Sequence, residues 1–123
     1  MLKTPPQLAE DARKEIPEIQ VQTVRTDLDK GKLPYILVDV REAHEQAQGT
    51  IPGAVCIPRG VLEMQITKTV QDEKAAIVCY CGGGTRSLFA AQQLKKMGFT
   101  DVKSMAGGFG TWHKTGNPVS KPQ

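Results

Sequence analysis

Cysteine is scarce in this chain of 123 residues: there are three, at positions 56, 79 and 81. An odd number of cysteines without the spacing of a disulfide framework indicates free thiols and a reducing compartment. No apolar run approaches the roughly 18 residues that a membrane-spanning helix needs. The first residues also lack the apolar segment of a signal peptide. These absences together predict a cytoplasmic protein with no membrane partner.

Aromatic residues are also few, at 5% of the chain, and lysine and arginine form no dense run. Both features argue against a nucleic-acid partner. The length predicts one domain, long enough to form a core without disulfides. The charge is uneven, because residues 1–81 carry a net −2 and residues 82–123 a net +5. This imbalance indicates either attraction of a small anion to the second segment or a solvated basic surface.

Apolar and amphipathic segments alternate along the chain. Strands are predicted at residues 19–22, 35–40, 54–57, 75–80 and 102–105. Helices are predicted at residues 24–30, 42–48, 88–97 and 111–114, with a further helix after residue 60 and a polar connection at 67–74. This order predicts an α/β sandwich with a mainly parallel sheet of about five strands. Ligands of such sheets bind beyond the carboxyl ends of the strands.

An additional helix is expected at the N-terminus. Thr4 can cap it, Pro5 suits its first position, and Gln7 completes the spacing of a capping box. The helix is expected to run to about Lys14 and to stop before Pro17. Because few of its residues are apolar, it is predicted to lie on the domain as an accessory element, outside the core.

A cysteine followed by three glycines separates the strand at 75–80 from the helix at 88–97. Glycines let backbone N–H groups converge on one point, and the N-terminus of a helix adds further donors. A cysteine at the start of such a loop is stabilised as a thiolate. The pattern therefore predicts an anion pocket in which Cys81 is the candidate nucleophile.

The two remaining cysteines lie outside this loop. Cys79 can pair with Cys81 as a metal ligand, can act as a resolving thiol, or can be a core residue. No further cluster of cysteine and histidine completes a tetrahedral site, so no metal is predicted. Cys56 is flanked by apolar residues and is expected to be buried. His44 and His113 are expected to be exposed.

Four stretches resemble, in order, the motifs of the single-domain rhodaneses, which are sulfurtransferases. They are the segments LVDVRE at 37–42, GTIPGA at 49–54, CGGGTRS at 81–87, and GGFGTW at 107–112 with GNPV at 116–119. The resemblance covers about residues 19–119. It implies a rhodanese-like three-layer sandwich at 19–119, a helical extension at 1–18 and a tail at 120–123.

The resemblance also implies a function. A sulfane sulfur would move from a small anionic donor, thiosulfate by default, to cyanide or a thiol through a persulfide on Cys81, with no cofactor. The residues expected to bind substrate are Gly82, Gly83, Gly84, Thr85, Arg86 and Ser87. Arg86 would hold the loop closed or meet the donor. Asp39 and Arg41 are expected to brace the loop, although an aspartate at a strand end is more commonly a cap or turn residue.

Two other functions compete with this one. A persulfide carrier or regulatory module would use the same loop chemistry to pass sulfur to a protein partner. A cysteine phosphatase would need five residues between its cysteine and arginine, whereas four separate Cys81 from Arg86. The shorter loop makes a smaller cradle, which favours a sulfur atom over a phosphate group.

Overall fold

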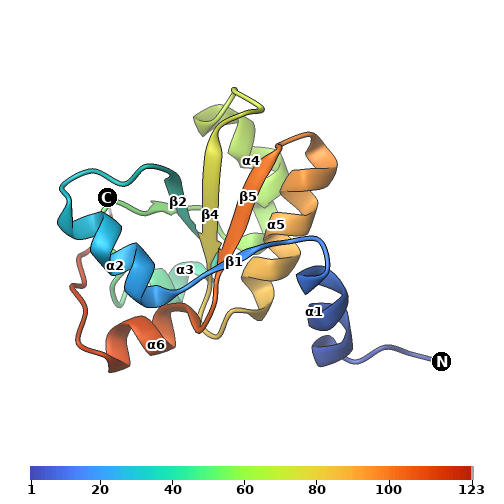
Figure 1. The fold of residues 1–123 in the computed structure, drawn as a ribbon, viewed down its shortest axis with the longest axis horizontal. Helices are drawn as coiled ribbons and strands as arrows, with labels where there is room; N and C mark the ends of the chain where they lie inside the picture. Colours follow the sequence, from blue (N-terminus) through green and yellow to red (C-terminus); the bar gives the residue numbers. More distant parts are fainter. Residues whose placement is uncertain (123) are drawn as a thin grey trace.

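The central feature of the protein is a five-stranded, wholly parallel β-sheet with the strand order β1-β5-β4-β2-β3. The computed structural model describes residues 1–122. The strands are β1 (Glu18–Ile19), β2 (Ile36–Asp39), β3 (Val55–Cys56), β4 (Ala76–Tyr80) and β5 (Asp101–Met105). Strand β4 lies in the middle of the sheet (Figure 1). The predicted α/β class with a parallel sheet is confirmed.

Helices cover both faces of this sheet. They are α1 (Pro5–Arg13), α2 (Val21–Asp29), α3 (Ala43–Gln46), α4 (Leu62–Thr69), α5 (Thr85–Met97) and α6 (Gly108–Lys114), with a 3-10 turn η1 (Arg59–Val61) before α4. Successive side chains of a strand point to opposite faces. Ile77 and Cys79 of β4 therefore pack with α1, α4 and α5, whereas Val78 and Tyr80 pack with α2 and α6. The result is a three-layer sandwich with a core on each side of the sheet.

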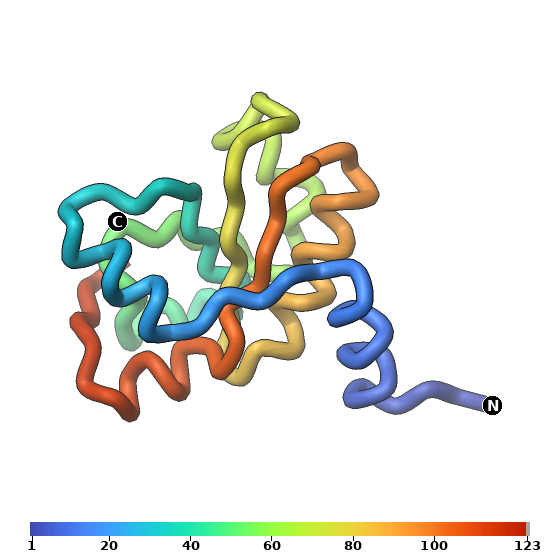
Figure 2. The backbone as a smooth tube through the Cα atoms, in the orientation of Figure 1, coloured from blue at the N-terminus to red at the C-terminus, as the bar shows by residue number. Residues whose placement is uncertain are grey.

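The N-terminal helix α1 begins as predicted but does not stay outside the core. The Thr4 side chain accepts from the Gln7 N–H, and the Gln7 side chain accepts from the Thr4 N–H, which forms the capping box. Ala9, Ala12 and Ile16, however, are buried in the same cluster as residues of α5 and β5. Figures 1 and 2 show α1 beside α5. The prediction that α1 is only an accessory was wrong, because its small apolar face completes the core.

Several element boundaries also differ from the prediction, among them the end of β1 and the end of α4. The strand expected at 19–22 ends at Ile19, and α2 already begins at Val21. Val21 and Val24 are both buried, three residues apart on one helix face, so the apparent alternation in this segment was the start of a helix. Likewise α4 continues to Thr69 into the predicted polar connection, because Ile66 and Val70 are buried. Within residues 1–122 no helix is both long enough and apolar enough to span a bilayer.

Candidate active site

The glycine loop lies at the carboxyl edge of the sheet, where the central strands end. Strand β4 ends at Tyr80 and α5 begins at Thr85, so residues 81–84 form the loop. Asp39, the last residue of β2, is paired in register with Tyr80. Because β2, β4 and β5 are parallel, the segments that follow them gather at this one edge.

The Cys81 sulfur faces one N–H donor from its own loop and one from the first turn of α5. The Gly84 N–H donates to Sγ at 3.1 Å, and the Ser87 N–H donates to it at 3.4 Å. Gly84 has φ +101°, a conformation that favours glycine and turns its N–H toward the sulfur. The Cys81 residue is only 1% exposed. Two backbone N–H groups thus converge on a buried sulfur.

Ser87 is fixed in the first turn of α5, which begins three residues earlier than the predicted helix. Its hydroxyl lies 3.5 Å from the Cys81 Sγ, 3.2 Å from the Gly84 carbonyl oxygen and 2.7 Å from the Ser104 hydroxyl. Ser104 lies in β5 and is fully buried. The sequence analysis missed Ser104, since a serine in a strand carries no motif that links it to a distant loop.

The carbonyl side of the loop is held by α6. The N–H groups of Phe109 and Gly110 donate to the carbonyl oxygens of Cys81 and Gly82, at 2.7 and 2.9 Å. A Cβ atom at Gly108 would lie 2.5 Å from the Cys81 oxygen, so only glycine permits this close approach. These contacts turn the loop carbonyls toward α6 and leave the N–H groups free to face the sulfur.

The Arg86 guanidinium pairs with Glu45 of α3, and within residues 1–122 it donates no hydrogen bond to the Cys81 sulfur. Its Nη1 donates to Oε2 at 2.8 Å and its Nη2 to Oε1 at 3.1 Å. The hydrogen bonds from Arg86 lower the pKa of Glu45 to about 2, although partial burial opposes this shift. Glu45 was missed in the sequence, where it belongs to a polar segment and serves equally as the third residue of a capping box.

Asp39 and Arg41 form a buried ion pair near the loop. The Arg41 Nη2 donates to the Asp39 Oδ2 at 2.8 Å and to the Gly49 carbonyl oxygen at 2.7 Å. The Arg41 guanidinium carbon lies 4.1 Å from the centre of the Phe109 ring, within the range of a cation–π contact. Arg41 thus contacts the residue whose N–H holds the Cys81 carbonyl, not the sulfur itself.

The other cysteines lack comparable donors. Cys79 is fully buried, and burial raises the pKa of its thiol to about 12. Cys56 is half-buried, not buried as predicted, and burial also raises the pKa of its thiol. Among residues 1–122, no three or more His, Cys, Asp or Glu side chains gather as a metal site would require. Cys81 is therefore the cysteine with a site built around its sulfur.

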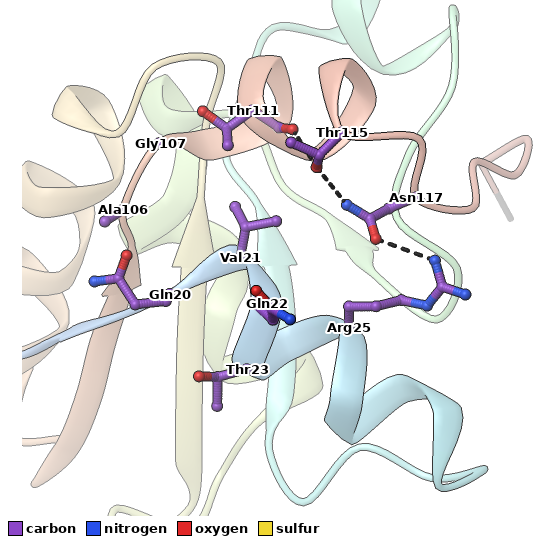
Figure 3. A pocket seen from close by; sticks show the side chains of 10 residues that line it. All are labelled: Gln20, Val21, Gln22, Thr23, Arg25, Ala106, Gly107, Thr111, Thr115 and Asn117. Atoms are coloured by element: carbon purple, nitrogen blue, oxygen red, sulfur yellow. Dashed lines mark hydrogen bonds between the residues drawn. The ribbon is translucent and has the colours of Figure 1, made fainter.

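A groove of about 810 Å³ lies between α2 and α6, at the ends of β1 and β5 (Figure 3). Its side chains are mostly uncharged, and its arginine, Arg25, is bound by Asp29 and Asn117. Gly107 lines the groove and lies behind Gly84 of the loop, but Cys81 does not line it. The groove therefore presents no candidate nucleophile.

Known proteins resemble this chain over most of its length. A family model described as a rhodanese-like domain matches residues 20–115. A thiosulfate sulfurtransferase, GlpE, from Pseudomonas savastanoi pv. phaseolicola is 36% identical over 102 residues, which cover 83% of this chain and 89% of that protein.

Two further proteins broaden the comparison. YrkF from Bacillus subtilis, whose name marks it as a candidate sulfur carrier, is 35% identical over 97 residues; these cover 79% of this chain but only 51% of that protein. A solved structure from Rhodopseudomonas palustris, described as of unknown function and as a possible tyrosine phosphatase, is 28% identical with a TM-score of 0.87. The match covers 98% of this chain and 96% of the chain in that structure.

Proposed function

Since the chain belongs to the rhodanese-like domain family, we propose that it is a sulfurtransferase that moves a sulfane sulfur through a persulfide on Cys81. The proposed donor is a small anion, thiosulfate by default, and the proposed acceptor is cyanide or a thiol. The observation that carries the proposal is the pair of N–H groups, from Gly84 and Ser87, directed at the Cys81 sulfur.

In the first step the Cys81 thiolate attacks the outer sulfur of thiosulfate. A bond forms between Sγ and that sulfur, the donor's sulfur–sulfur bond breaks, and its electron pair leaves with sulfite. The product is a persulfide whose outer sulfur carries the negative charge. Fixed N–H donors around the sulfur stabilise such an anion without reorganising.

In the second step cyanide or a thiolate attacks the outer sulfur of the persulfide. The bond from Sγ to this sulfur breaks, and its electron pair returns to Sγ as the regenerated thiolate. The products are thiocyanate or a new persulfide on the thiol. Atoms and electrons balance in both steps, so the proposed cycle calls for no metal or organic cofactor.

The loop residues have separate proposed roles. Gly84 and Ser87 bind the sulfur through their N–H groups, and Thr85 begins the helix that supplies them. Gly83 is exposed, and a Cβ atom there would meet no atom within 4 Å, so we place the donor's entry beside it. Asp39 and Arg41 support the loop through Phe109.

A persulfide carrier is the second candidate function, favoured by the resemblance to YrkF. A carrier would form the same persulfide but would pass its sulfur to a protein acceptor and turn over small donors slowly.

Either role suits a reducing compartment, and the three cysteines at positions 56, 79 and 81 are free thiols. We therefore assign the protein to the cytoplasm and the activity to residues 19–119.

The mass of the intact protein tests this proposal. After incubation with thiosulfate we expect a gain of one sulfur atom, about 32 Da. The gain should disappear on addition of cyanide and should be absent in Cys81→Ser, whereas Cys56→Ser should still show it. No adduct with thiosulfate or 3-mercaptopyruvate would reject the small-donor enzyme. Steady-state rates then separate an enzyme from a carrier.

A further inference from the structure

Arg86 is the cation of the candidate site, yet its guanidinium is occupied. Both of its terminal nitrogens donate to the two carboxylate oxygens of Glu45, which comes from α3. Such a bidentate pair fixes the plane of the guanidinium as well as its position. Arg86 is thus held by a neighbouring element and is not free to follow a ligand.

The pair lies at the rim of the loop. A Cβ atom at Gly82 would be 3.1 Å from the Arg86 Nη2 and 3.9 Å from the Glu45 Oε1, so the pair closes over this glycine. The side chains of Arg86 and Glu45 remain 37% and 28% exposed. The partly exposed pair therefore lies beside Gly82, next to the proposed donor entry at Gly83.

The pair also sets the charge at the entrance. Glu45 is the main group that raises the pKa of Arg86, and the Cys81 charge contributes less. A guanidinium and a carboxylate in contact have no net charge, and their field falls off faster with distance than that of a single cation. The N–H groups of Gly84 and Ser87 then remain as the donors that face an anionic sulfur.

We propose that Glu45 is a positioning residue that holds Arg86 at the loop rim beside Gly82 and cancels its charge, so that backbone N–H groups rather than Arg86 bind the anionic donor. This inference rests on the proposed sulfur transfer at Cys81. It assigns Arg86 to the closure of the loop and gives α3 a part in donor recognition.

Steady-state kinetics of Glu45→Gln with thiosulfate test this role. In this variant Arg86 is released from Glu45 and can contact the thiosulfate dianion, so the KM for thiosulfate should fall roughly threefold. The loop would lose its fixed geometry, so kcat should fall roughly tenfold. Glu45→Asp keeps the charge but shifts the guanidinium, so it should lower kcat and leave KM unchanged. Asp29→Asn, which breaks a similar pair with Arg25 on α2, should change neither.

Alkylation of Cys81 gives a readout that does not need sulfur transfer. The ratio of its rates with anionic iodoacetate and neutral iodoacetamide, followed on the Cys81 peptide, should rise roughly threefold in Glu45→Gln. A lower kcat with KM and the alkylation ratio unchanged would reduce Glu45 to a structural support and overturn the inference. If the wild type forms no persulfide, the proposed function fails while this ratio still decides the role of Glu45.

Discussion

The three cysteines differ in what surrounds their sulfur atoms. Two backbone N–H groups donate to the sulfur of Cys81, whereas burial raises the pKa values of Cys56 and Cys79. Thiolates are the reactive form of cysteine, so an inert buried thiol and a nucleophile need opposite surroundings. Sequence spacing alone left the role of Cys79 open; its full burial and the raised pKa of its thiol favour the packing role over the resolving thiol.

Arg41 is the residue on which the buried charge of Asp39 depends. The Asp39 carboxylate is fully buried and the Arg41 side chain is 6% exposed. Removal of one partner from a buried pair leaves an uncompensated charge and costs about 3–5 kcal/mol. Arg41→Ala should therefore lower the free energy of unfolding in urea by about that amount.

Arg25→Ala is the matched control for this prediction. The Arg25 Nε donates to both carboxylate oxygens of Asp29 on α2, where the two side chains are 37% and 57% exposed, and its Nη1 donates to Asn117. An exposed pair contributes less than about 1 kcal/mol. Equal losses in the two variants would contradict the role of burial at Arg41.

At the level of elements, the approach of α6 to the loop depends on one glycine. Gly108 has φ +58°, and a Cβ atom there would lie 2.5–2.7 Å from backbone atoms of Cys81 and Gly82. Gly108→Ala should push the loop away from α6, loosen the hydrogen bonds to the loop carbonyls and weaken persulfide formation. Overpacking of this kind costs about 1–3 kcal/mol.

Gly116→Ala is the control that separates the steric clash expected at Gly108 from the cost of placing alanine in a left-handed backbone conformation. Gly116 has φ +79°, and a Cβ atom there would meet nothing within 4 Å. Its substitution should cost only the left-handed conformation, about 1–2 kcal/mol, and should leave the rate of persulfide formation unchanged. A similar loss of activity in both variants would show that contact with the loop is not what matters at Gly108.

The helix α1 contributes to the core of the domain, and Ile16, just after its end, extends this contact. Ile16 is 2% exposed and packs in the cluster that contains Leu94 and Val102. Ile16→Ala should destabilise the protein by about 2–5 kcal/mol in urea unfolding, as large-to-small core substitutions do. Leu8→Ala, on the exposed face of α1, should change stability by no more than about 0.5 kcal/mol. A small effect at Ile16 would contradict a stabilising role for the segment that follows α1.

The sequence predicted the elements whose signals are local. The apolar segment that became β4, the glycine loop and the capping box of α1 each lie within a few consecutive residues. The pairing of Glu45 with Arg86 joins two segments far apart in the chain, and so does that of Ser87 with Ser104. Such contacts depend on which strands lie side by side in the sheet. The residue pattern of a single segment does not reveal that order.

At the scale of the whole molecule, the net charge of a sequence segment does not predict the charge around the Cys81 sulfur. The net +5 of residues 82–123 suggested a basic attraction toward the loop. The fold places Glu45, from the acidic segment, on the loop arginine, while Lys95 and Lys96 lie at the far end of α5. In the proposed mechanism, the local attraction for an anion therefore comes from backbone N–H groups rather than from the basic segment as a whole.

Two carboxylates in ion pairs, those of Glu45 and Glu63, contribute to the pH dependence of the protein's stability. The pKa of Glu45 is lowered to about 2 by Arg86. Burial opposes the ionisation of Glu63, but a backbone hydrogen bond and those from Gln93 and Arg59 outweigh it, so the pKa of Glu63 is also lowered. A carboxylate with a lower pKa in the folded state binds fewer protons when folded. The stabilisation by Glu45 is thus complete above the ordinary value near 4.5 and is lost as the pH falls toward 2.

Urea unfolding of wild type and Glu45→Gln at a series of pH values tests this dependence. The wild type should be the more stable protein at pH 7, and its advantage should shrink as the pH is lowered from about 4.5 toward 2. Gln22→Ala, an exposed and uncharged change on α2, should differ from wild type by the same amount throughout. An advantage over Glu45→Gln that stayed constant down to the lowest pH would mean that Arg86 does not stabilise the Glu45 carboxylate, and the positioning role of Glu45 would lose its electrostatic basis.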